Sequence, residues 1–72
     1  MQALAVMQAE ALKASRWVGA GFAEQSRKMH YGEAEVETIH GQATPREAEE
    51  LIEEGIAVLP LPFPVAPPDD LN

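Results

Sequence analysis

The first 28 residues carry an apolar pattern with the spacing of a helix. From Gln2 to about Lys28 the chain is rich in Ala, Leu, Met, Glu, Gln and Lys and has no proline, a composition that favours helix. Apolar side chains recur every three or four positions along one row, which consists of Leu4, Met7, Ala11, Ala14, Val18 and Phe22. This spacing predicts one long amphipathic helix. Glycines at positions 19 and 21 predict a kink, a break between two helices or a close-contact spot.

Residues 33–39 follow a different pattern, because acidic and other side chains alternate strictly. Glu33, Glu35 and Glu37 occupy one side of this segment in an extended conformation, and the residues between them occupy the other. A period of two predicts a half-exposed edge strand, with a one-turn helix as the alternative. If residues 33–39 form a strand, residues 56–59 are its expected parallel partner, joined to it through the helix that lies between them.

A second helix is predicted at residues 45–54 from its end signals. Thr44 is an N-cap residue, Pro45 suits the first helical position, and Glu47 can complete a capping box. Gly55 supplies a left-handed stop. Four glutamates lie in and near the last turn, where the negative end of the helix dipole disfavours them, so we expect a basic partner surface to face Glu49, Glu50, Glu53 and Glu54.

The segment after Gly55 alternates proline with apolar residues up to Pro68, a pattern typical of polyproline II conformation. Positions 64–67 have the proline spacing read by aromatic-grooved domains, but no basic residue lies beside them. We expect this arm to pack on the protein's own helices, since it would otherwise expose a large apolar area. Docking of the arm on a partner is the alternative.

These elements predict a mainly α protein with a long N-terminal helix, a short capped second helix and a proline-rich C-terminal arm. The predicted boundaries are residues 1–59 for the small helical domain and 60–72 for the acidic, proline-rich arm. The alternative is an α+β fold with short strands at 33–39 and 56–59.

Charge is distributed unevenly along the 72 residues. The net charge is −7, and residues 1–32 carry a balance of +2 while residues 33–72 carry −9. The acidic half would repel phosphates, so we expect no direct binding to nucleic acid. No apolar run approaches the roughly 20 residues of a membrane helix, and the first residues do not resemble a secretory signal, so a cytoplasmic location is predicted.

The sequence offers little that predicts catalysis or metal binding. Glu37 and His40 have a Glu-x-x-His spacing that could hold a metal on a helix, but a solvated acidic face is the expected role. Ser15 and Ser26 both fall in the predicted first helix, and the chain is too small for a preformed pocket. With no cysteine either, we expect no enzymatic activity and no cofactor.

The sequence therefore predicts a small acidic regulatory protein that binds and occludes a larger protein, such as a transcription factor, as an antiactivator or inhibitor does. Its partner is expected to have a basic or apolar surface. The candidate partner-binding residues combine interface-type side chains with the acidic face, and they are Arg16, Trp17, Phe22, Glu49, Glu50, Glu53, Glu54 and Phe63. The alternatives are a homo-oligomeric structural or assembly subunit and a carboxylate and histidine metal-binding protein.

Overall fold

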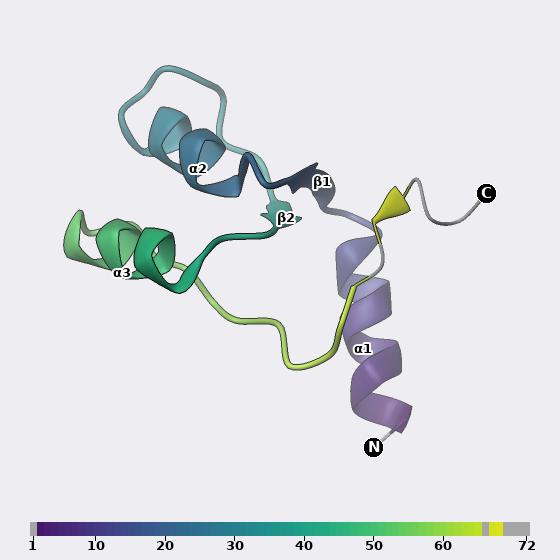
Figure 1. Cartoon of the computed structure of the whole chain (residues 1–72). Coiled ribbons are helices and arrows are strands. Elements are labelled where there is room, and N and C mark those ends of the chain that lie inside the picture. The colour runs from purple at the N-terminus through teal and green to yellow at the C-terminus, as the bar shows by residue number, and fades with distance from the viewer. Residues whose placement is uncertain (1, 66, 69–72) are drawn as a thin grey trace.

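The part of the protein that the structure describes is mixed α/β, with three short helices and two short strands. A computed structural model describes residues 2–65 and 67–68. The elements follow one another as α1 (Gln2–Leu12), β1 (Arg16–Gly19), α2 (Phe22–His30), β2 (Ile39–Gly41) and α3 (Pro45–Glu53) (Figure 1). The two strands are parallel, and α2 connects them. The prediction of a mainly helical fold is therefore correct only in part, because the described chain contains helices but also a parallel strand pair, which makes it mixed α/β.

The single long N-terminal helix is wrong, because the chain leaves the helix after Leu12. The backbone N–H of Ser15 donates to the carbonyl of Leu12 at 3.0 Å, which tightens the last turn. The next residues form β1, where Trp17 and Val18 have the aromatic and β-branched side chains that strands favour. Gly19 has a φ of +55°, which no α-helix contains.

Two glycines lie opposite each other in the strand pair. Trp17 is opposite His40 and Gly19 is opposite Gly41, with an irregularity in the register between Trp17 and Gly19. A Cβ atom built on Gly41 would overlap the carbonyl oxygen of Gly19. Gly41 is therefore required for the strands to pair at this distance.

The predicted pairing of residues 33–39 with residues 56–59 is wrong. Only the end of the first segment, from Ile39, enters a strand, and its partner is β1. Ile56 instead donates its backbone N–H to the carbonyl of Leu51 at 2.9 Å, which closes the end of α3, and prolines follow at 60 and 62. This helix closure and the missing proline N–H groups leave residues 56–59 outside the sheet.

The second helix is confirmed with its capping box. The Thr44 hydroxyl accepts the backbone N–H of Glu47 at 3.1 Å, and the Glu47 carboxylate accepts the backbone N–H of Thr44 at 2.9 Å. Pro45 is the first helical residue, and Gly55 takes a φ of +86° after the helix. These local signals fix both ends of α3.

A small core lies between α2 and α3. Leu51 of α3 has no exposed surface, and Ala23 of α2 and Ile56 are buried with it. Phe22 and Val58 are partly buried against this cluster. The core is formed by α2, α3 and the segment that follows α3.

Helix α1 lies apart from that core and runs beside the C-terminal arm (Figure 1). The Gln8 side chain joins the two, since its amide donates to the Phe63 carbonyl at 3.0 Å and its carbonyl accepts the Phe63 N–H at 3.3 Å. The arm thus contacts the protein's own helix, as predicted for this part of it. Ala66, within the proline motif, and residues 69–72, which begin with two aspartates, lie outside the described residues.

The chain exposes more surface than its mass requires. Its accessible surface is 5533 Å², whereas a compact monomer of 7.8 kDa is expected to expose about 4,400 Å². Its radius of gyration is 12.9 Å, against about 11 Å expected for a compact chain of this length. Along residues 2–65 and 67–68, no helix has both the length and the apolar character needed to cross a membrane.

Candidate partner-binding surface

Helix α1 and the arm form an exposed and nearly uncharged surface. We call residues 2–12 and 59–65 together the α1–arm surface. Its large apolar side chains are exposed to a degree unusual for a small protein, with fractions of 57% for Leu4, 59% for Val6, 66% for Met7, 88% for Leu59 and 41% for Leu61. Glu10 is the one charged residue in these two ranges, and its carboxylate pairs with Lys13 at 2.6 Å.

Apolar side chains point from opposite sides of α1. At 100° per residue, Leu4 and Met7 share one side of the helix, and Val6 lies on nearly the opposite side from Leu4. A helix with apolar side chains around it is normally buried, yet none of the described residues of α1 is. An isolated helix of 11 residues is also marginal in water. The sequence of α1 is therefore typical of a helix that is buried against another surface.

An ionic cluster joins α2 to α3 on the other side of the molecule. Arg27 of α2 binds the Glu54 carboxylate with Nε at 2.8 Å and Nη2 at 2.8 Å, and the Tyr31 hydroxyl donates to the same carboxylate at 2.9 Å. The hydrogen bonds from Arg27 and Tyr31 lower the pKa of Glu54 below its usual value. The bond to Glu54, followed by partial desolvation, raises the pKa of Tyr31.

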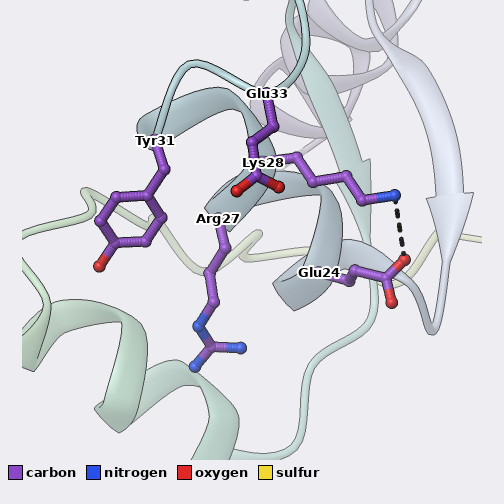
Figure 2. A pocket seen from close by; sticks show the side chains of 5 residues that line it. All are labelled: Glu24, Arg27, Lys28, Tyr31 and Glu33. Carbon is purple, nitrogen blue, oxygen red and sulfur yellow. Dashed lines mark ion pairs between the residues drawn. The ribbon is translucent and has the colours of Figure 1, made fainter.

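An open pocket of about 480 Å³ lies beside this cluster, larger than was expected of so small a chain, and Figure 2 shows the side chains that line it. Arg27 points from α2 toward α3, while Lys28 pairs with Glu24 at 3.5 Å (Figure 2). Tyr31 and Glu33 complete the lining. Because two basic and two acidic side chains line it, the pocket has no excess charge that would select a charged ligand.

The ionic cluster takes up two of the four glutamates that were predicted to face a partner. Glu54 is held by Arg27, and Glu50 lies 3.8 Å from Arg27 and 3.7 Å from Arg46. Arg27 thus supplies from within the chain the basic group expected of a partner. Glu49 and Glu53 are exposed on the outer side of α3.

Replacing Glu54 with glutamine should lower the melting midpoint in a manner that depends on pH. Because the folded-state pKa of Glu54 is depressed, the stabilisation is fully present above the ordinary glutamate pKa of about 4.3 and is lost as pH falls through the folded-state pKa. The difference in midpoint between the wild type and Glu54→Gln should therefore be constant near neutral pH and shrink in acid. Thermal melts from pH 7 to pH 3 measure it, with the exposed neighbour in Glu53→Gln as control; a difference that grows in acid contradicts the assignment.

A second polar cluster holds the start of β1 on β2. Arg16 binds Glu37 through two hydrogen bonds of 3.0 Å each, which lower the pKa of Glu37. Ser15 Oγ lies 2.7 Å from His40 Nδ1, and the rings of His40 and Trp17 pack in a T-shaped arrangement with 5.6 Å between their centroids. Sequence reasoning missed the Ser15 and His40 contact because it placed Ser15 inside a helix.

The two residues of the Glu-x-x-His spacing do not lie on a helix. Glu37 and His40 lie in an extended segment and a strand instead of a helix, and their side chains contact Arg16 and Ser15. Throughout the described residues, no three His, Cys, Asp or Glu side chains are grouped so that they could hold a metal ion.

The predicted partner-binding residues do not converge on one surface. Arg16 and Trp17 lie at the sheet, Phe22 packs half-buried against the core, and the glutamates lie on or just after α3. Phe63 lies on the α1–arm surface through its contact with Gln8. The apolar residues of α1 were absent from the predicted set, because the sequence predicted one continuous helix up to about Lys28 and gave no sign that residues 2–12 form a separate helix.

The fold and this surface define a small α/β protein with a parallel strand pair, a two-helix core and a separate N-terminal helix. Residues 1–66 match the family described as "Protein of unknown function (DUF1178)", and the chain belongs to this family. No curated protein and no solved structure matches the chain.

Proposed function

We propose that this chain is a small acidic regulatory protein that binds a larger protein through the α1–arm surface and occludes the site it covers. The observation that carries the proposal is α1 itself, which has apolar side chains on opposite sides and no buried residue among those described.

The partner should combine an apolar binding surface with basic surroundings. The α1–arm surface carries one charge, so its direct contacts are apolar, whereas residues 33–72 carry a balance of −9. A basic partner would be attracted to the acidic half, which raises the rate of association and orients it. The basic surface of a transcription factor has this chemistry, and occluding it would inhibit that factor.

A second copy of the chain is the alternative occupant of the same surface. It would bring a further net charge of −7 to the interface, which disfavours self-association. The different, basic partner is therefore the first proposal and the homo-oligomer the second. Sedimentation at high concentration separates them, because only the second predicts a dimer or larger species.

Replacing Leu4 and Met7 with glutamine should abolish partner capture without unfolding the protein. Burying each side chain at an interface is worth about 1.5 kcal/mol or more, so the double variant should bind about 100-fold more weakly. Glutamine keeps the helix propensity of leucine and methionine, and α1 lies outside the core, so the melting midpoint should stay close to that of the wild type. The measurement is capture from host lysate by tagged protein at low and high salt, with quantitative mass spectrometry.

Ile52→Gln is the matched control, because Ile52 is 60% exposed but lies on α3. A stoichiometric partner retained by the wild type and by this control, and lost with the α1 double variant, supports the proposal. Equal capture by all three proteins contradicts it.

A further inference from the structure

A separate apolar groove lies along α2, on a part of the protein that the α1–arm surface does not include. Phe22 and Met29 of α2, Ile39 of β2 and Ile56 contribute apolar side chains to it, and Val36 lies at its side with 84% of its surface exposed. Its volume is about 350 Å³, within the range of sites that bind ligands. We call this feature the α2 groove.

Two chain segments that belong to neither strand contribute to the α2 groove. Residues 36–38 lead into β2, and residues 56–57 follow α3. Within the described part of the chain, the backbone groups of Val36 and Ala57 make no hydrogen bond to another backbone group. The N–H of Glu37 meets a weak acceptor, the Met29 sulfur, at 3.4 Å. Peptide groups therefore remain available beside the groove for pairing with an added strand.

The charges beside the α2 groove restrict what could enter it. Glu35 is exposed, forms no salt bridge with another described residue and lies next to Val36, whereas Glu37 lines the groove and is paired with Arg16. Side chains of an added strand alternate between two sides. If every second side chain of the added strand is apolar and points into the groove, the side chains between them lie near Glu35 and Glu37. Lysine or arginine is favoured at those positions.

We propose that the α2 groove binds an extended peptide segment of a partner protein in which apolar and basic residues alternate, and that this segment adds as a strand to residues 35–38. A second copy of the chain does not fit this description, because its five basic residues nowhere alternate with apolar ones over a strand's length. The proposal is independent of the α1–arm surface, and either site can fail without the other.

The first test compares two fluorescent, acetylated peptides of equal composition, one alternating lysine with valine and one with the lysines and valines in separate blocks. The alternating peptide should bind about tenfold or more tightly, since only it presents both patterns at once. N-methylation of every second amide should abolish binding in one register and leave it largely intact in the other, because only one edge of an added strand pairs with the protein. Fluorescence anisotropy of the full chain measures both effects.

Protein variants locate the site without disturbing the core. Val36→Lys places a positive charge beside the groove and should weaken binding about tenfold or more, whereas Ile52→Lys on α3 should change it little. The Leu4→Gln and Met7→Gln double variant should bind the peptide like the wild type. The proposal is overturned if neither peptide binds or if both bind equally well. It is also overturned if the two N-methylation registers have equal effects, or if Val36→Lys has none.

Discussion

Leu51→Ala should lower the free energy of unfolding by about 2–5 kcal/mol, a large part of the total for a chain of this size. Leu51 is the one fully buried large side chain among the described residues, and it lies where α2, α3 and Ile56 meet. Its truncation leaves a cavity in a core with few other side chains to fill it. The melting midpoint should fall by at least about 10 °C, measured by circular dichroism.

The neighbouring residue provides the control for this prediction. Ile52 belongs to the same helix and has a similar side-chain volume, but it is 60% exposed. Ile52→Ala should therefore change the midpoint only slightly, because little apolar surface is lost from the core. Similar losses for the two variants would mean that the core does not lie where the structure places it.

Gly41→Ala should separate the two strands and cost about 1–3 kcal/mol. The added methyl group would overlap the Gly19 carbonyl oxygen, which belongs to the backbone of β1 and cannot move aside like a flexible side chain. Trp17 is opposite His40, beside this position, and is the only tryptophan of the chain, so its fluorescence reports the change. The midpoint should fall and the Trp17 emission should shift.

Gly32→Ala separates this steric effect from ordinary backbone strain. Gly32 has a φ of +78° and open space around its Cα, so alanine there strains the backbone without striking a neighbour. It should lower the midpoint but leave the Trp17 emission unchanged. A Gly41→Ala protein with wild-type emission would contradict the close strand contact.

The sequence was sufficient to predict α3 because local interactions determine it. Thr44, Pro45, Glu47 and Gly55 specify its ends through contacts within a few residues of the chain. No distant part of the protein is needed to form the capping box or the left-handed stop.

The strand pair could not be predicted in the same way. Residues 16–19 continue a helical apolar row, and the energy that makes them a strand comes from contacts with residues more than 20 positions away. The Arg16 pair with Glu37 and the Ser15 contact with His40 are of this kind. Tertiary contacts thus overrode local helix propensity.

The candidate site was predicted in part. The arm residue Phe63 lies on the proposed surface, but the acidic face was assigned to a partner although Arg27 neutralises part of it. Nothing in the sequence places Arg27 beside Glu54, since 27 positions separate them. The apolar side chains of α1 were visible in the sequence, and only the structure shows that α2 and α3 do not cover them.

Peptide-resolved hydrogen exchange of the purified chain, alone and with the captured partner, is the most direct test of whether α1 is uncovered in the free protein and becomes buried on binding. In the chain alone, the amides of α1 should exchange much faster than those of α3 around Leu51, because α1 buries none of its described residues. Binding should slow exchange in α1 and the arm and leave α3 nearly unchanged. Amides in α1 that are already as protected as those of α3, or that gain no protection in the complex, would contradict the account.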